Sequence, residues 1–352
     1  MYSSYSSLQQ SQLAAQGYYD TQSTYLLVYA PGRSTALRAT LADQLHRKFR
    51  LADTLGSALT EGVDGVLLVS EDVECMSTAL MCFAKALQDG ADYAVCNAVF
   101  GFGGATALYQ SRAHLAQNRC ALVSRPLLER CRAAAKDPEN VTELLALAAQ
   151  FCAHPARIPQ ALLHYERDIC AEDAFSATGK RAFLMSHVLD MTGAPIVLVS
   201  AVPVLRSMGY EVVVLGPSDG GALQLFVDAG AAVITRPGIR ATPNLWGLAL
   251  CTDLVLVNTV VMARTVRALS GTAVPVLWWL HDAFAGYPHI AHQIPTKLAE
   301  NVRLYSVGHH AANAMHAVRP DFQIGQLIYG LPDYAAEDFP RRQAPLCHRR
   351  LL

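Results

Sequence analysis

The second half of the chain alternates between short apolar runs and longer segments with helical periodicity. The apolar runs predict strands at 182–186, 211–215, 232–235, 253–258 and 274–280. Helices are expected between them at 195–208, 222–229 and 260–269. Strands that alternate with helices of this length indicate βαβ units and a parallel, doubly wound sheet. Because such sheets bind ligands at the carboxyl ends of their strands, the loops that follow the strands are the first place to look for a site.

The first half has a less regular pattern. Its apolar runs predict strands at 25–30, 63–69 and 93–99, and helices are expected at 36–49, 78–88, 124–134 and 140–152. A polar segment with a glycine close to its end, 166–180, separates the two halves. We therefore expect an α/β protein with two Rossmann-like modules, divided into a disordered lead (1–24), a first module (25–167), a linker (168–180), a second module (181–335) and an irregular tail (336–352).

Composition narrows the class of protein. Of the 352 residues, 52% are hydrophobic and 16% are charged, which is typical of a chain with a large buried core. The net charge of -1 argues against nucleic acid as a partner, because a phosphate-backbone binder carries a concentrated basic surface. The richest apolar stretches, 194–205 and 254–263, are about half the roughly 20 residues of a spanning helix. No membrane span is expected, and peripheral membrane contact stays open.

The location of the protein is predicted from its N-terminus and its cysteines. The first residues have no basic start and no apolar run, so they do not form a secretion signal. The nine cysteines are scattered without a C-x-x-C pair, which disfavours both a disulfide framework and a zinc site. We expect reduced thiols in a cytoplasmic protein.

The loop after the strand at 182–186 has the features of a ligand-binding turn. Thr192 can cap the following helix, Gly193 allows close approach of the backbone, and Pro195 suits a first helical turn. A helix N-terminus with free N–H groups is a natural seat for phosphate or carboxylate, although an ordinary strand-to-helix turn looks the same. The loop lacks G-x-G-x-x-G, which counts against a dinucleotide enzyme. Asp219, after the second strand, keeps an NAD-type oxidoreductase as a weaker alternative.

Three sequence motifs follow one another along the second half of the chain. They are a second strand GYEVVVL at 209–215, a strand DLVLVNT at 253–259 and a strand PVLWWLHD at 275–282. Their order and spacing resemble the N-terminal domain of glycosyltransferase family 4, whose enzymes have the GT-B fold. The resemblance covers about 150 residues of the chain, 181–335. The resemblance implies transfer of a sugar from a UDP-, GDP- or dTDP-sugar donor to a glycan or polysaccharide acceptor.

The same resemblance assigns roles to particular residues. His281 would be the catalytic residue beside the donor sugar, where an imidazole can donate a hydrogen bond or stabilise developing charge. The residues that would bind substrate are Thr192, Gly193, Ala194, Asn258, Thr259 and Asp282. Taken alone, without its motif, His281 is more typical of a histidine that caps the end of a strand. Trp278 and Trp279 are neighbours on a strand and face opposite sides, so at least one is expected in the core and the other is open to sugar stacking.

An acidic run ends the strand at 63–69 in the first half. Two carboxylates at i and i+2, Asp72 and Glu74, can ligate a hard divalent ion such as Mn²⁺ or Mg²⁺. A solvated acidic turn that caps the next helix is the alternative. Together with CALVSR at 120–125 and P-x-x-L-x-H at 159–164, this run is similar to the later part of glycosyltransferase family 2, which has the GT-A fold.

The end of the chain limits what the resemblance implies. In GT-B enzymes a second Rossmann domain carries most donor contacts, and here residues 343–352 show no strand pattern where that domain should begin. We therefore expect a truncated or frame-altered product. The alternative function is a catalytically silent module that binds a nucleotide sugar or glycan, or acts as a scaffold.

Overall fold

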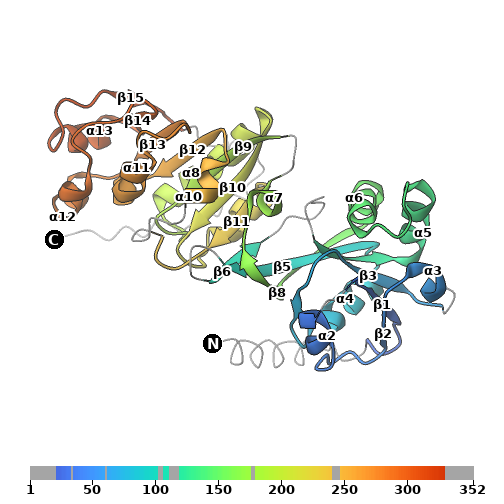
Figure 1. Ribbon diagram of the computed structural model, residues 1–352. Helices are drawn as coiled ribbons and strands as arrows, with labels where there is room; N and C mark the ends of the chain where they lie inside the picture. The colour runs from blue at the N-terminus through green and yellow to red at the C-terminus, as the bar shows by residue number, and fades with distance from the viewer. Residues whose placement is uncertain are drawn as a thin grey trace, which may run out of the picture.

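The protein is a mixed α/β structure in which one sheet runs through both halves (Figure 1), and this confirms the predicted fold class. The strands of the second half are parallel, whereas those of the first half pair in both directions. The computed structural model describes residues 21–32, 35–59, 62–101, 106–110, 119–175, 179–239 and 246–329. The predicted tail at 336–352 and most of the predicted lead lie outside these residues. Residues 21–24 of that lead belong to the folded part, because Thr21 is fully buried and its hydroxyl lies 3.2 Å from Nδ1 of His46.

The first half forms one end of the sheet. Its strands are β1 (Leu26–Tyr29), β2 (Phe49–Ala52), β3 (Gly65–Val69), β4 (Glu74–Cys75), β5 (Tyr93–Gly101), β6 (Thr106–Gln110), β7 (Cys120–Ser124) and β8 (Pro155–Asp168). Its helices are α2 (Thr35–Leu41), α3 (Leu55–Ala58), α4 (Ala79–Gln88), α5 (Arg125–Ala134), α6 (Val141–Phe151) and α7 (Ala171–Ala174). The main strands follow the order β6-β5-β7-β3-β1-β2. The helix predicted at 36–49 ends at Leu41, and β2 begins where it was expected to stop.

The second half forms the other end. Its strands are β9 (Lys180–Met185), β10 (Tyr210–Gly216), β11 (Ala232–Thr235), β12 (Leu254–Asn258), β13 (Val276–Leu280), β14 (Val302–Ser306) and β15 (Ile324–Gln326). Its helices are α8 (Gly193–Ser207), α9 (Leu223–Asp228), α10 (Trp246–Leu250), η3 (Val260–Met262), α11 (Ala263–Leu269), η4 (Phe284–Gly286), α12 (Tyr287–Ile290), η5 (Ala291–Gln293) and α13 (His309–His316). These strands are all parallel, in the order β15-β14-β13-β12-β9-β10-β11.

Both faces of this parallel sheet are covered, which explains why its strands read as almost continuous apolar runs. Trp278 and Trp279 point to opposite faces and belong to different core clusters. They are 0% and 3% exposed, so neither indole is available to stack on a sugar. Both residues therefore serve the core, and the open alternative of sugar stacking by one of them is excluded.

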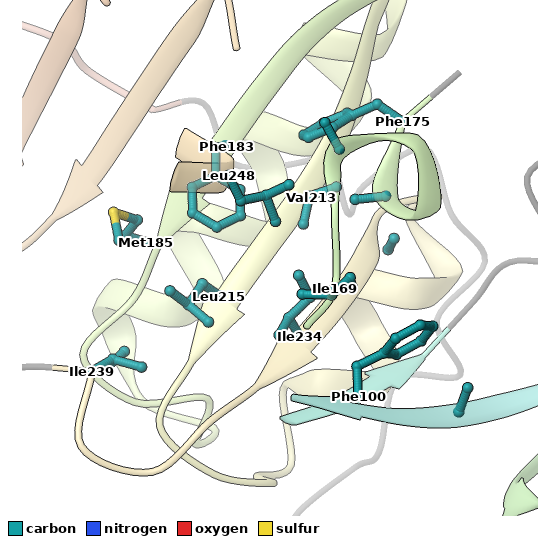
Figure 2. Packing of buried hydrophobic residues seen from close by; sticks show 14 of the residues in the cluster. Phe100, Ile169, Phe175, Phe183, Met185, Val213, Leu215, Ile234, Ile239 and Leu248 are labelled. Atoms are coloured by element: carbon teal, nitrogen blue, oxygen red, sulfur yellow. The ribbon is translucent and has the colours of Figure 1, made fainter. Parts of the chain in front are cut away.

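The two halves are joined by strand pairing and by a shared core. β11 pairs antiparallel with β6, so the sheet continues without a break from β15 to β2. Figure 2 shows Phe100 and Ile169 beside Ile234, with Phe175 nearby. Ile169 and Phe175 are buried, although both lie in the segment predicted as a linker. At Ile169 and Phe175, the predicted linker is therefore part of the folded core.

Two further predictions concern the cysteines and membrane-spanning helices. None of the cysteines of the described residues forms a disulfide, and most of them are buried. Burial raises the pKa of Cys75 and of Cys82 to about 12, so neither forms a thiolate at neutral pH. Within the described parts of the chain, no helix is both long enough and apolar enough to cross a membrane.

Candidate functional site

The carboxyl ends of β9, β12 and β13 lie side by side. β12 is parallel to both neighbours, with Val257 opposite Met185 of β9 and Asn258 opposite Trp279 of β13. The turn and loop residues that follow these strands therefore share one edge of the sheet. We call this edge the rim and define it by the residues 186–194, 258–260 and 281–282. It contains every residue that the sequence assigned to catalysis or substrate binding in the second half.

Asn258 connects two parts of the rim. Its side chain is fully buried, and Nδ2 donates a hydrogen bond of 3.1 Å to the carbonyl oxygen of Ala194. The other side-chain atom, Oδ1, is buried and accepts no hydrogen bond from the described residues. Buried polar atoms are nearly always satisfied, so this acceptor is a candidate for a ligand hydroxyl or for water.

The N-terminus of α8 begins at the rim. Thr192 occupies the N-cap position, but its side chain accepts no hydrogen bond from the helix, contrary to the predicted capping role. Gly193 is exposed, and a Cβ added there would meet nothing within 4 Å. The first turn of a 15-residue helix therefore opens on free space. Its unbonded N–H groups and partial positive charge favour an anion there.

His281 lies directly after β13, against the indole of Trp279. The two ring centroids are 4.8 Å apart, and Nε2 is buried without a hydrogen-bond partner among the described residues. Burial, with a smaller contribution from the nearby His187, lowers the pKa of His281 to about 4. The imidazole is therefore neutral at pH 7, where it can donate or accept a hydrogen bond but carries no charge.

His187 belongs to the rim, although it was not among the predicted site residues. Its Nδ1 lies 3.2 Å from the hydroxyl of Thr259, which is almost fully buried. The available signal was its position, since it is the first residue after the strand predicted at 182–186 and lies inside the loop already singled out. No local pattern distinguishes it from the other polar residues of that loop.

The loop that carries His187 is held by the glycines after β10. A Cβ on Gly220 would lie 2.3 Å from the carbonyl oxygen of Leu189, and one on Gly216 would lie 2.4 Å from the Leu189 side chain. Neither position has room for a side chain. The segment 216–221 was singled out by the sequence for its acidic residue, Asp219. In the structure its glycines are the important residues, because they let the two loops approach closely.

The acidic run of the first half has protein partners. The carboxylate of Asp72 accepts hydrogen bonds from the hydroxyl of Thr35 and from the backbone of Ala36 and Leu37, each at 3.2 Å. Oε2 of Glu74 lies 2.6 Å from Nδ1 of His164. Among the described residues, no three His, Cys, Asp or Glu side chains are grouped so that they could hold a metal ion. This donor set fits a cation poorly, and metal binding by Asp72 and Glu74 stays a prediction.

Two hollows in the described surface lie away from the rim. One, of about 550 Å³, lies between the end of α4 and the start of β8. The other, of about 790 Å³, follows β14 and β15 and includes Lys297 and Asp321. We give the rim more weight than either hollow, because the rim combines an open helix N-terminus with buried polar atoms that lack partners.

These features define a Rossmann-like domain with an open rim at the carboxyl ends of its strands. Residues 178–316 match the family model described as "Glycosyl-transferase family 4". No curated protein and no solved structure matches the chain significantly. The family match includes the whole rim and supports a glycosyltransferase. It does not extend to 25–167, so the similarity of that region to family 2 stays a prediction.

Proposed function

We propose that the protein is a glycosyltransferase, or part of one, whose rim holds the sugar end of a UDP-, GDP- or dTDP-sugar for transfer to a glycan or polysaccharide acceptor in the cytoplasm. The observation that carries this proposal is the pair of buried, unpartnered atoms at the rim. They are Nε2 of His281 and Oδ1 of Asn258, beside the open N-terminus of α8. They lie in the region that matches family 4.

Each part of the rim has a chemical task in this proposal. The N–H groups at the start of α8 would bind a phosphate of the donor, and the bare backbone at Gly193 would let it approach. The neutral imidazole of His281 would hydrogen-bond a hydroxyl of the transferred sugar and stabilise charge that develops as the bond to the phosphate breaks. Asn258 would accept a hydrogen bond from a sugar or acceptor hydroxyl through Oδ1.

Nucleotide release from each donor sugar, with and without Mn²⁺, tests the enzyme. Removal of one hydrogen-bonding group that acts in the transition state lowers kcat by about 10²- to 10³-fold, and we expect a loss of this size for His281→Ala. His154→Ala is the control, because this exposed histidine lies in the other half of the chain. Equal rates for the two variants would overturn the role of His281. If turnover needs Mn²⁺, Asp72→Asn tests the first module separately.

The second candidate function is a binding module without turnover. It is favoured by the exposed Gly193 at the N-terminus of α8, because a helix N-terminus can bind an anion without any catalytic group. Calorimetry with UDP, GDP and dTDP distinguishes the two functions. Binding without nucleotide release supports the silent module, whereas the absence of both would overturn both proposals.

A further inference from the structure

Thr259 has a backbone conformation that its residue type normally avoids. Its φ is 75° and its ψ is 159°, and it is the one non-glycine residue with a positive φ among the described residues. This region of backbone space belongs almost entirely to glycine, and a β-branched side chain makes it still less favourable. Such a conformation persists only where the surrounding structure determines it. The contacts around Thr259 must therefore stabilise this conformation.

Three hydrogen bonds hold the turn, and in each of them the partner lies on β13 or is the second residue beyond it. The N–H of Thr259 donates to the carbonyl oxygen of Trp279 at 2.8 Å, and the indole N–H of Trp278 donates to the carbonyl oxygen of Thr259 at 2.8 Å. The N–H of Val260 donates to Oδ2 of Asp282 at 2.6 Å. Of these three bonds, the one to Asp282 is the only one made by a side-chain acceptor.

The conformation of this turn determines where the Thr259 hydroxyl lies at the rim. With Thr259 in this conformation, its hydroxyl lies 3.2 Å from Nδ1 of His187, and His187 is close enough to His281 to affect its pKa. A relaxed turn would move the Thr259 hydroxyl and remove its contact with Nδ1 of His187. Asp282 therefore acts on the rim through the backbone that follows β12.

We propose that Asp282 is a positioning residue, which holds the left-handed Thr259 turn so that Thr259 and His187 stay in place at the rim, and is not a ligand of the sugar. The inference deepens the proposed function, on which its relevance to nucleotide-sugar binding rests. It also explains why the pairs Asn258-Thr259 and His281-Asp282 occur at the ends of adjacent strands, since the second pair fixes the backbone of the first.

The indole N–H resonance of Trp278 reports the turn without any ligand. Asp282→Ala removes the acceptor for Val260, so we expect this resonance to shift in a ¹H–¹⁵N spectrum. Asp282→Asn keeps an oxygen acceptor, and we expect the resonance to stay near its original position. The tryptophans are Trp246, Trp278 and Trp279, so Trp246→Phe and Trp279→Phe assign the signal. An unchanged resonance in Asp282→Ala would overturn the proposal.

Replacement of Thr259 by glycine gives an independent test. Glycine adopts this conformation without strain, so the turn would then need Asp282 less. We expect Asp282→Ala to lower the melting temperature clearly in the original chain and by about half as much in the Thr259→Gly background, a coupling that a double-mutant cycle measures. Equal losses in both backgrounds would contradict the proposal, because they would mean that Asp282 stabilises something other than this turn.

UDP binding separates this inference from the proposed function. If Asp282 positions the turn, Asp282→Asn should bind UDP within about threefold of the original affinity and Asp282→Ala about tenfold more weakly. Equal weakening in both variants, with the Trp278 resonance disturbed only in Asp282→Ala, would show that the carboxylate touches the ligand and would overturn the positioning role. A chain that binds no UDP refutes the proposed function for that nucleotide, while the resonance and melting tests still decide the role of Asp282.

Discussion

His281 shows how burial changes a residue's chemistry. A histidine on a surface exchanges its proton near pH 6.5, but the one at the end of β13 has a pKa of about 4 because it is buried beside Trp279 and near His187. At neutral pH it is an uncharged hydrogen-bonding group, and this state suits a sugar hydroxyl better than a phosphate. The helix N-terminus of α8 is the better site for the phosphate.

The lowered pKa of His281 predicts a pH dependence of stability. Between about pH 4 and 6.5 the unfolded chain binds a proton at this histidine and the folded chain does not. The free energy of unfolding should therefore fall as the pH drops through this window, by at most about 1.4 kcal/mol per pH unit from this group. In His281→Gln this contribution should vanish. Urea unfolding from pH 7 to pH 4 measures both slopes, and identical slopes would show that His281 titrates normally.

At the scale of elements, the rim depends on two loops that touch through glycine. The loop after β9 carries His187 and Leu189, and the loop after β10 approaches it at Gly216 and Gly220. The parallel strands set where these loops start, but the missing side chains set how closely they meet. A change at either glycine therefore acts on the rim without touching any residue that would contact a ligand.

Gly220→Ala should destabilise the protein, whereas Gly193→Ala should leave its stability almost unchanged. The added methyl at Gly220 would lie 2.3 Å from a backbone oxygen that cannot move freely, so we expect a loss of about 1–3 kcal/mol, as in other overpacked sites. At Gly193 the methyl meets nothing, and we expect a change within about 0.5 kcal/mol. Denaturant unfolding of both variants checks this, and equal stabilities would refute the close contact between the loops.

At the scale of the whole molecule, one sheet carries both modules. β6 and β11 pair at the junction, and Arg167 adds ion pairs there with Glu71 and with the buried Asp173. A side chain removed from this network would leave a buried charge without its partner, which is strongly destabilising in other proteins. We therefore expect the modules to unfold as a single unit, even though their sequence patterns differ.

Unfolding should reveal this continuity. All three tryptophans lie in the second half, so their fluorescence follows that half alone, while far-UV circular dichroism follows both. We expect the two signals to change at the same denaturant concentration, as they do in a cooperative transition. A dichroism change that precedes or follows the fluorescence change would mean that the halves unfold separately.

The sequence predicted the regular half of the fold better than the irregular half. Strands β9 to β13 follow from apolar runs separated by helical periods, and the parallel order then places Asn258 and His281 on one rim. The edge strand β15 has three residues and β2 has four, too few for a pattern to be seen. The junction could not be predicted either, because the pairing of β6 with β11 joins segments more than 100 residues apart.

Local sequence patterns were enough to predict that some residues lie at the rim, but not to predict the contacts between residues far apart in the chain. Position in a motif identified His281 and Asn258 as residues of the rim. The bond from Val260 to Asp282 and the contact of Thr259 with His187 span 22 and 72 residues, and no local pattern contains either of them. Asp72 illustrates the same limit, since its backbone partners on α2 lie 35 and 36 residues earlier in the chain.

The most direct test of the rim is a titration followed by the imidazole signals of the histidines. A ¹³C-edited NMR spectrum, recorded while UDP-, GDP- or dTDP-sugars are added, should show shifts at His281 and His187, with His154 unchanged. Assignment by His281→Gln and His187→Gln identifies the signals. Saturable shifts at His281 and His187 with one of the donors are the predicted result. Shifts confined to His154, or none at all with any donor, would contradict the assignment of this rim to nucleotide-sugar binding.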